Sequence, residues 1–439
     1  MTPHSRLAAV AGLTLAGFVA LAPVAGTRAS QRLAPSASGS SASARHDAQW
    51  VASWAAMPQL TEPSNMPPAP YTQSASVLTD TTLRQTVHVT IGGSRIRLRF
   101  SNAFGGAPLQ LTKVAVALPV GGAAGVSGTQ PGTMYPVTFG GRPSVVVPTG
   151  ALMVSDPLDL RVPPLSNLTV TAYLAKGQAS TAITSHPGSR TTSYLAHGDQ
   201  VGATDLVRAT PVDHWYFISD LEVLEPARAS AVDVIGDSLT DGRGSTTNGN
   251  DRWPDQLAAR LQAYRSTADV AVINEAAGGN RVLNDGLGPN ALARFDRDVL
   301  AQSGVDAVIV FEGVNDIGTA DATARAQRVV TADLIQAYQQ MIVRAHAQGI
   351  RVYGATITPF GGNSMYDDPQ GLRDRSREAV NTWIRNSRAF DAVIDFDRAA
   401  RDPQDPERLR PSYDVGDHLH MNPAGYEALA AAVPLSLFR

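Results

Sequence analysis

The sequence predicts an α/β protein of two domains, in which a doubly wound domain with a parallel sheet follows an all-β domain. The chain has 439 residues, more than a single apolar core usually serves. Strand and turn signals dominate from Trp50 to about Glu225, whereas short apolar runs alternate with helical stretches from Ala231 onward. We therefore expect a β-sandwich or jelly-roll-like domain at residues 49–226 and an α/β domain at residues 229–439.

The N-terminal segment has the pattern of a targeting signal. Arg6 precedes the apolar run Leu7–Ala25, and small residues continue to Ala29. This pattern is typical of a secretory signal peptide at residues 1–29, although the run is also nearly long enough for an uncleaved membrane anchor. The Ser- and Ala-rich residues 30–48 favour a flexible linker. We expect a secreted protein, extracellular or periplasmic, with no stable membrane insertion after signal cleavage.

The first domain is predicted from alternating strands and their turns. Thr86–Ile91 and Ile96–Phe100 alternate on either side of Gly92–Gly93, which predicts a hairpin. Further strand-like runs are Val114–Leu118, Ser144–Val147 and Leu168–Leu174. Gly and Pro separate these runs and no long helical period appears, so a sandwich or jelly roll is expected.

The second domain is predicted from buried strands that alternate with helices. The apolar runs are Val232–Ile235, Val270–Ile273, Ala307–Phe311, Val352–Ile357 and Ala392–Phe396. The helical stretches are Trp253–Tyr264, Ala291–Ala301, Ala324–Ala347 and Arg373–Asn386. Such runs indicate a parallel sheet of about five strands buried on both faces. Functional side chains should then lie at the carboxyl ends of the strands.

Composition excludes several classes of function. The formal net charge is -3, which gives no reason to expect nucleic acid or an anionic membrane as a partner. The sequence contains no cysteine, which excludes disulfides, a thiol nucleophile and thiolate zinc sites.

The first predicted strand of the α/β domain leads directly into a serine, in the run Val234–Gly242. Ser238 is thereby exposed at the end of a rigid element, and the following segment offers backbone N–H groups to an anion, as an acyl-transfer nucleophile requires. The segment lacks the Gly-x-Ser-x-Gly elbow, because residue 240 is Thr. Taken alone, Asp237 and Ser238 are equally compatible with a cap of the next element.

The second and third strands are followed by candidate oxyanion donors. Gly278 and Gly279 allow the backbone to approach a ligand closely, and Asn315 can donate its side-chain amide to a developing negative charge. Taken separately, each segment is also compatible with an ordinary turn.

The last loop carries a candidate base and its orienting carboxylate. Asp417 and His420 are three residues apart, so one short segment can present both groups. His418 competes for the role of base, but as a neighbour in sequence it points elsewhere if His420 faces Ser238. Asp417, His418 and His420 also suit a metal by ligand type, yet no further acid or histidine cluster accompanies them. We expect no metal and no other cofactor.

Four loops therefore carry Ser, Gly, Asn and Asp-x-x-His in this order, and the set resembles the SGNH hydrolases, also called GDSL esterases and lipases. The matching positions are Ser238 in Gly-Asp-Ser-Leu, Gly279, Asn315 in Gly-Val-Asn-Asp, and Asp417 with His420. The resemblance covers roughly residues 231–438. It implies a flavodoxin-like three-layer α/β/α domain and an oxyanion hole formed by the N–H groups of Ser238 and Gly279 with the Asn315 side chain. The N-terminal region is similar to an all-β region that precedes this domain in some bacterial secreted members.

These observations predict a serine esterase that hydrolyses carboxylic ester bonds through an acyl-enzyme, with a small-molecule or polysaccharide ester as substrate. We favour carbohydrate esters, because a β domain can dock a glycan and no long apolar lid sequence is present. The alternatives are a lipase or arylesterase acting on small acyl esters, a non-catalytic carbohydrate-binding protein, and a metal-dependent phosphoesterase.

The two domains are expected to pack against each other. Only residues 225–231 remain as a joint between strand-like runs, which is too short for free tethering. His186, in the loop Ser185–Gly188, is the first β-domain candidate for contact with the active-site cleft, although a packed or capping role is the simpler interpretation of this residue.

Overall fold

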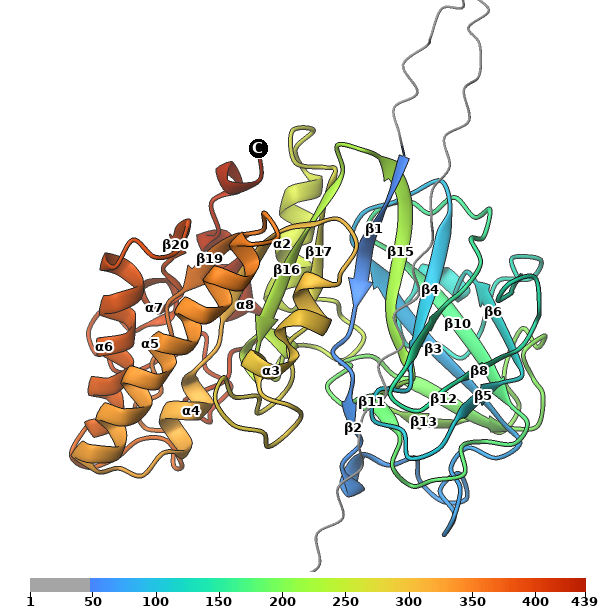
Figure 1. The fold of residues 1–439 in the computed structure, drawn as a ribbon, viewed down its shortest axis with the longest axis horizontal. Helices are drawn as coiled ribbons and strands as arrows, with labels where there is room; N and C mark the ends of the chain where they lie inside the picture. Colours follow the sequence, from blue (N-terminus) through green and yellow to red (C-terminus); the bar gives the residue numbers. More distant parts are fainter. Residues whose placement is uncertain (1–47) are drawn as a thin grey trace, which may run out of the picture. The chain divides into compact units, whose positions relative to one another are not determined.

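The computed structural model describes residues 48–439 (Figure 1). The predicted signal peptide at 1–29 and the predicted linker up to residue 47 lie outside the described residues. Ala48, the last residue of the predicted linker, already begins the first strand. No helix in the described part of the chain is both long and apolar enough to cross a membrane.

The first part of the described chain is built almost entirely from antiparallel sheets. In sheet order, the six-stranded sheet consists of β13 (Thr210–Val212), β12 (Ser193–His197), β3 (Thr81–Val89), β10 (Ser166–Leu174), β6 (Lys113–Ala117) and β7 (Tyr135–Val137). The four-stranded sheet consists of β1 (Ala48–Ala55), β15 (Ile218–Pro226), β4 (Ile96–Ser101) and β9 (Leu152–Val154). Smaller sheets contain β14 (Trp215–Tyr216), β11 (Thr184–His186) and β2 (Gln59–Leu60), and β5 (Leu109–Leu111) with β8 (Val145–Val147). Two short 3₁₀ helices span Pro63–Asn65 and Val120–Gly122.

The two larger sheets share one apolar core. Val87 and Leu168 from the six-stranded sheet are fully or almost fully buried, as are Leu98, Phe100 and Leu221 from the four-stranded sheet. Burial of these side chains between two layers is the main source of stability of such a domain. The prediction of an all-β domain is confirmed.

The predicted hairpin around Gly92–Gly93 is wrong. β3 pairs with β10 and β12, whereas β4 pairs with β15 and β9, so the chain changes sheets between these two strands. Gly93 instead forms a bridge with Val162, and a Cβ at Gly92 would overlap the Val162 carbonyl oxygen. The two glycines therefore allow a close crossing of chain segments, not a tight two-residue turn.

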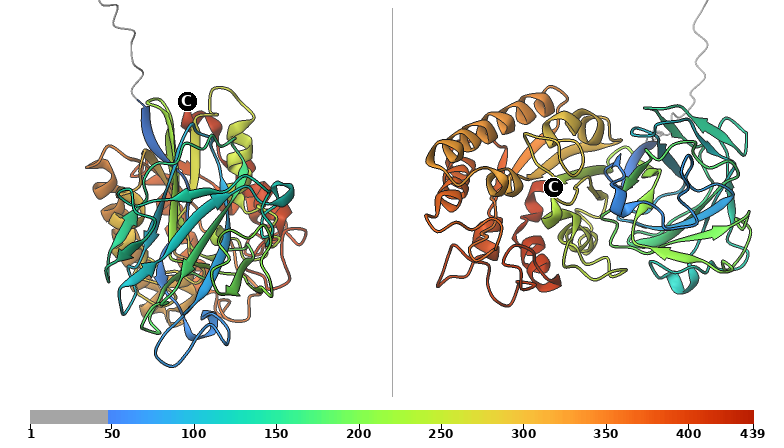
Figure 2. Two further views of the ribbon diagram at one scale, coloured as in Figure 1. Left: turned by 90° about the vertical axis from the view of Figure 1, so that its right-hand side faces the viewer. Right: turned by 90° about the horizontal axis from the view of Figure 1, so that it is seen from below.

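The second part is a parallel sheet between two layers of helices. In sheet order, its strands are β17 (Val270–Asn274), β16 (Ser230–Gly236), β18 (Val305–Phe311), β19 (Arg351–Ala355) and β20 (Ala392–Ile394). On one face α2 (Trp253–Gln262), α7 (Phe396–Ala400) and α8 (Pro423–Ala432) pack together, and on the other α3 (Ala291–Phe295), α5 (Ala324–His346) and α6 (Leu372–Asn386) pack together (Figure 2). Short helices α1 (Ser238–Asp241) and α4 (Val314–Thr319) follow β16 and β18, and a final 3₁₀ turn spans Leu435–Phe438. The predicted doubly wound α/β fold with five strands is confirmed.

Several predicted elements have different ends; the strand expected at Val352–Ile357, for example, is β19 and stops at Ala355. The helix expected at Ala291–Ala301 is α3 followed by a π-helical turn at Asp296–Leu300. The strand expected to reach Phe396 stops at Ile394, because the Asp395 side chain accepts the Arg398 N–H and begins α7.

The order of the strands determines where a site can form. β16, the first strand of the domain, has β17 on one side and β18 on the other. The crossover direction reverses there, so the loops after these strands diverge and leave a crevice at their carboxyl ends. Ser238 directly follows β16 at this position.

The two parts of the molecule are packed against each other. Only residues 227–229 lie between β15 and β16, and Ala231 and Ala271 are buried in the apolar core of the β part. The Val272 N–H donates to Thr90 Oγ1 at 3.1 Å. The expected packing is thus present, while the domain limits at 226 and 229 stay a prediction.

Candidate active site

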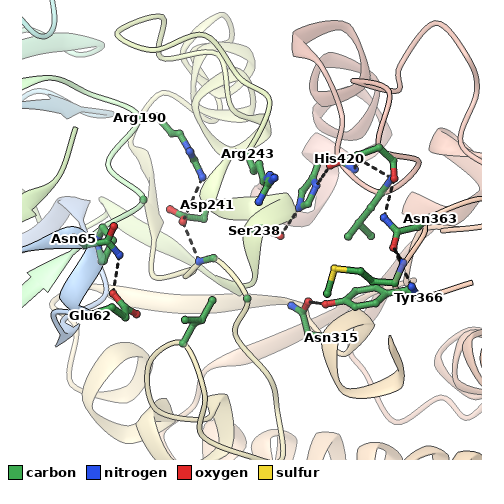
Figure 3. A pocket seen from close by; sticks show the side chains of 18 of the residues that line it. Glu62, Asn65, Arg190, Ser238, Asp241, Arg243, Asn315, Asn363, Tyr366 and His420 are labelled. Atoms are coloured by element: carbon green, nitrogen blue, oxygen red, sulfur yellow. Dashed lines mark hydrogen bonds and ion pairs between the residues drawn. The ribbon is translucent and has the colours of Figure 1, made fainter. Parts of the chain in front are cut away.

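A cavity of about 930 Å³ opens at the carboxyl ends of β16, β17 and β18 (Figure 3). Its floor and one side come from the α/β part and include Ser238, Gly279, Asn315, Asp417 and His420. The β part supplies the other wall, from Gln59, Glu62, Asn65, His186, Pro187, Gly188, Arg190, Asp213 and His214. The cavity therefore contains every predicted site residue and is completed by the β part.

Ser238 is held at the start of α1. Asp237 caps this helix, because its carboxylate accepts the Leu239 N–H at 2.9 Å. The turn ends at Gly242, whose φ of 92° lies in the left-handed region that favours glycine. A Cβ at Gly236 would lie 2.5 Å from Thr240 Oγ1, so glycine is required there for the helix to fold back on the strand. These constraints leave the Ser238 side chain facing the cavity with 7% of the residue exposed.

Ser238, His420 and Asp417 form a continuous hydrogen-bonded chain. Ser238 Oγ lies 2.8 Å from His420 Nε2, and His420 Nδ1 lies 2.7 Å from Asp417 Oδ2. Because a carboxylate only accepts, the His420 proton resides on Nδ1, and Nε2 is left to accept the Ser238 hydroxyl proton. The His420 backbone N–H also donates to Asp417 Oδ1, which fixes the two residues relative to each other. This arrangement suits the transfer of a proton from the serine to the histidine.

The surroundings favour neutral His420 and ionised Asp417. Burial lowers the pKa of His420 below its usual value and outweighs the opposing effect of Asp417, while Arg243 and Arg190 lower it further. Burial acts to raise the pKa of Asp417, but the hydrogen bonds from His420 and its charge hold that pKa below the usual range. The histidine is therefore available as a base over a wide range of pH.

The predicted oxyanion donors meet beside Ser238. Within residues 48–439, the backbone N–H groups of Ser238 and Gly279 have no hydrogen-bond acceptor, whereas the Gly278 N–H donates to Asp241 Oδ2 at 3.0 Å. Gly279 has a φ of 72°, a conformation that a side chain would strain. This geometry favours Gly279 over Gly278 as a donor to a ligand.

The Asn315 amide is oriented by a residue that sequence reasoning missed. The Tyr366 hydroxyl donates to Asn315 Oδ1 at 2.6 Å, and Asn315 Nδ2 donates to the Asn280 carbonyl at 2.8 Å (Figure 3). One N–H of the amide therefore remains for a ligand. Tyr366 lies in the loop between β19 and α6, and no motif in that loop distinguishes it from a packed aromatic residue.

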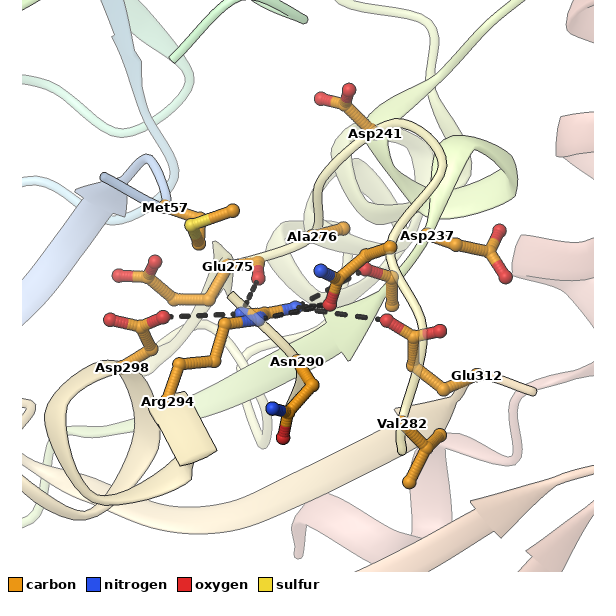
Figure 4. A network of polar contacts seen from close by, with 12 residues as sticks. Met57, Asp237, Asp241, Glu275, Ala276, Val282, Asn290, Arg294, Asp298 and Glu312 are labelled. Carbon is orange, nitrogen blue, oxygen red and sulfur yellow. Dashed lines mark hydrogen bonds and ion pairs between the residues drawn. The ribbon is translucent and has the colours of Figure 1, made fainter. Parts of the chain in front are cut away.

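A buried arginine holds the loop that carries Gly279. Arg294, in α3, donates to Asn280 Oδ1 at 2.9 and 3.0 Å and to the Glu275 carbonyl (Figure 4). It also lies 3.2 Å from Asp298 and 3.7 Å from Glu312. Burial raises the pKa of Glu312 well above its usual value. Arg294 thereby fixes both ends of the Glu275–Asn280 loop.

His418 does not compete with His420 in the folded chain. The Nδ1 atom of His418 lies 2.7 Å from Asp414 Oδ2, so its side chain is engaged by that carboxylate. The backbone at His418 has a φ of 61°, unlike the negative φ of an ordinary residue. No group of three metal-ligating side chains was found among residues 48–439.

Comparison with known proteins identifies part of the chain. Residues 234–428 match the GDSL-like lipase/acylhydrolase family. This region is a GDSL-like lipase/acylhydrolase domain. The predicted SGNH resemblance is thereby confirmed for most of the α/β part. No curated protein matches the chain.

Several solved structures are similar to part of the chain. A putative lipolytic protein from Desulfitobacterium hafniense is 20% identical, with a TM-score of 0.34, and the match covers 46% of this chain and 97% of that one. An acetyl xylan esterase is 20% identical, with a TM-score of 0.34 and coverage of 46% and 96%. A carbohydrate acetylesterase from Sinorhizobium meliloti is 19% identical, with a TM-score of 0.34 and coverage of 46% and 95%.

The β part reaches the oxyanion loop of the GDSL-like domain through His186. His186 Nε2 lies 2.9 Å from Asp241 Oδ1, and the other oxygen of Asp241 accepts the Gly278 N–H. His186 Nδ1 lies 3.0 Å from the Met57 carbonyl, so both ring nitrogens face acceptors. His186 and Asp241 therefore form a buried polar pair at the edge of the cavity. His186 thus lines the cleft, and it has a role beyond simple packing.

The environment of Asp241 favours its ionised form. Burial acts to raise the pKa of Asp241, but the charge and hydrogen bond of His186 hold it below the usual value. A Cβ at Gly188 would overlap Asp241 Oδ2, so only glycine lets the β-part loop approach so closely.

Proposed function

We propose that this protein is a serine esterase that cleaves carboxylic esters through an acyl-enzyme. The single observation that carries the proposal is the chain of 2.8 and 2.7 Å contacts from Ser238 through His420 to Asp417. Membership of residues 234–428 in an acylhydrolase family supports the same reaction class.

Each residue has a defined part in the proposed reaction. Ser238 Oγ attacks the ester carbonyl while His420 Nε2 takes the hydroxyl proton, and Asp417 stabilises the imidazolium that forms. The N–H groups of Ser238 and Gly279 and the Asn315 amide bind the oxyanion. His420 then gives the proton to the leaving alcohol, and a water molecule, activated in the same way, releases the acid from Ser238.

We favour a carbohydrate O-acyl ester as the substrate over a lipid or aryl ester. The wall that the β part adds to the cavity presents amide and imidazole groups, such as those of Gln59, Asn65 and His214. These groups suit the hydroxyls of a sugar better than a long acyl chain. A purely carbohydrate-binding role is disfavoured, because the three residues of a triad would then be assembled without use.

We also propose that the protein is secreted. The support is the pattern of residues 1–29, in which Arg6 precedes an apolar run and small residues. The proposal is tested by determining the N-terminus of the protein recovered from the culture medium or periplasm. A full-length chain retained in the cell membrane would contradict cleavage.

The esterase proposal is tested with Ser238→Ala. The variant should fold normally and lose about 10³-fold or more in kcat towards p-nitrophenyl acetate, because the nucleophile is absent. It should also fail to react with a fluorophosphonate probe that labels the wild type. Ser266→Ala, at an exposed turn after α2, is the matched control and should retain both properties. Turnover close to the wild type in Ser238→Ala would contradict the assignment.

A further inference from the structure

We propose that the esterase pocket takes esters whose alcohol carries a carboxylate, as a uronate sugar does, and that Arg190 and Arg243 bind this group. The inference rests on the proposed function, and it names a substrate class for the same pocket.

Arg243 places an uncompensated positive charge beside the nucleophile. Its backbone is fixed from two sides, because its N–H donates to the Ser238 carbonyl at 2.9 Å and its carbonyl accepts the Tyr426 hydroxyl at 2.6 Å. Its side chain is exposed, lines the cavity, and forms no hydrogen bond or ion pair with any residue of 48–439. The side chain therefore starts from a fixed backbone position close to Ser238, and its guanidinium is available to a ligand.

Arg190 brings a second guanidinium from the β part. It lies in the loop between β11 and β12, and its carbonyl accepts the N–H of Asn248, which belongs to the α/β part, at 2.8 Å. Its Nε is buried and has no acceptor in the described part of the chain. The nearest carboxylate oxygen is Asp241 Oδ2, 4.0 Å from Nη2, and that oxygen already accepts the Gly278 N–H.

The remaining acids of the cavity do not neutralise this pair. Glu62 accepts hydrogen bonds from the side chains of Gln59 and Asn65, and Figure 3 shows it apart from both arginines. Asp213 accepts the Thr192 hydroxyl at 2.9 Å and lies within ion-pair distance of neither arginine.

The two arginines lie on the side of Ser238 that the alcohol must occupy. His420 returns the proton to the leaving alcohol, so the alcohol lies next to the imidazole. Both guanidinium groups are close enough to His420 to lower its pKa, and Figure 3 shows them on that side of the serine. Asn315 and Tyr366 lie on the other side, where the acyl oxygen is bound. An anion on the alcohol therefore meets the arginines, and one on the acyl group does not.

A carboxylate on a sugar fits this environment. Guanidinium groups bind carboxylates and phosphates through paired charge-assisted hydrogen bonds. The adjoining wall supplies Gln59, Asn65 and His214, whose donors and acceptors suit sugar hydroxyls. A phosphate on an acyl glycerol shares the charge but not the hydroxyls, so it serves as a competing arm of the test.

The test compares substrates that differ only in charge. We would measure kcat and KM for an O-acetylated methyl galacturonoside, for its neutral C6 methyl ester and for an acyl glycerophosphate. The wild type should prefer the free acid over the methyl ester by about tenfold in kcat/KM, mainly through KM, since one charge-assisted contact is of this size. High salt should reduce the preference, because exposed charges are screened.

Variants then assign the preference to the two arginines. Arg243→Gln and Arg190→Gln should each lower the ratio of kcat/KM for the free acid to kcat/KM for the methyl ester about tenfold, whatever either change does to both rates through the pKa of His420. Arg265→Gln, in the exposed turn after α2, is the matched control and should change neither. If Arg190→Gln lowers both activities through misfolding, Arg243→Gln still decides the question, because the Arg243 side chain has no partner among the described residues to lose.

Each outcome separates the two proposals. Equal rates for acid and methyl ester in the wild type, or an unchanged preference in Arg243→Gln, would overturn the anion subsite and leave the esterase intact. A stronger preference for the acyl glycerophosphate would overturn the uronate assignment. Absence of hydrolysis of every ester, together with no probe labelling of Ser238, would instead overturn the proposed function.

Discussion

Asp241→Ala removes the residue that connects the β part to the oxyanion loop. In the wild type, the two carboxylate oxygens of Asp241 contact His186 Nε2 at 2.9 Å and the Gly278 N–H at 3.0 Å. Asp241 is 1% exposed and His186 is 3% exposed, so the contact between them is largely shielded from water. Removing one member of such a buried pair costs about 3–5 kcal/mol in the free energy of unfolding.

Asp241→Asn separates the loss of charge from the loss of hydrogen bonds. Its amide oxygen can still accept the Gly278 N–H, and its amide nitrogen can donate to His186 Nε2 in the tautomer that carries its proton on Nδ1. We expect this variant to lose only about 1 kcal/mol, the usual value of one hydrogen bond. The kcat of Asp241→Ala should fall about 10–100-fold, because the adjacent Gly279 N–H is no longer held in place.

The assay is urea unfolding at pH 7 combined with kinetics on p-nitrophenyl acetate, with Asp333→Ala on the exposed face of α5 as the control. Because the folded state lowers the pKa of Asp241, the extra free energy of unfolding that the wild type has over Asp241→Ala is fully present above the pKa of about 3.9 that Asp has in the unfolded chain. It is lost as pH falls through the folded pKa. An Asp241→Ala protein within about 1 kcal/mol of the wild type at pH 7, with unchanged kcat, would refute this reasoning.

Two further predictions concern the same site. Asn315→Ala should lower kcat about 10²–10³-fold with little change in KM, because the contact of the amide with the substrate oxygen strengthens as negative charge develops there. Tyr366→Phe should lower kcat less, since it removes only the hydrogen bond that orients the amide. An effect of Asn315→Ala on KM alone would make Asn315 a substrate-binding residue. The value of kcat/KM should fall at acid pH with an apparent pKa below 6.5, because burial lowers the pKa of His420 and a protonated His420 cannot act as the base. An apparent pKa above 6.5 would contradict the environment described for His420.

The sequence alone predicted the architecture of the α/β part and its central side chains. Strands buried on both faces are continuous apolar runs, so β16 and β18 were recognisable without their neighbours. Ser238 follows directly on such a strand, and Asp417 is only three residues from His420, so local spacing alone indicated these residues. These features depend on short stretches of chain, where the geometry of the backbone limits the possibilities.

Only the tertiary structure decided the sheet pairing of the β part and the wall of the cavity. β3 and β4 alternate like the arms of a hairpin, yet each pairs with strands far along the chain, and periodicity contains no information about partners. Tyr366 and His186 likewise contact Asn315 and Asp241 across separations of 51 and 55 residues. Such contacts arise from the burial of two whole surfaces against each other, a property of the folded chain that no local pattern of residues expresses.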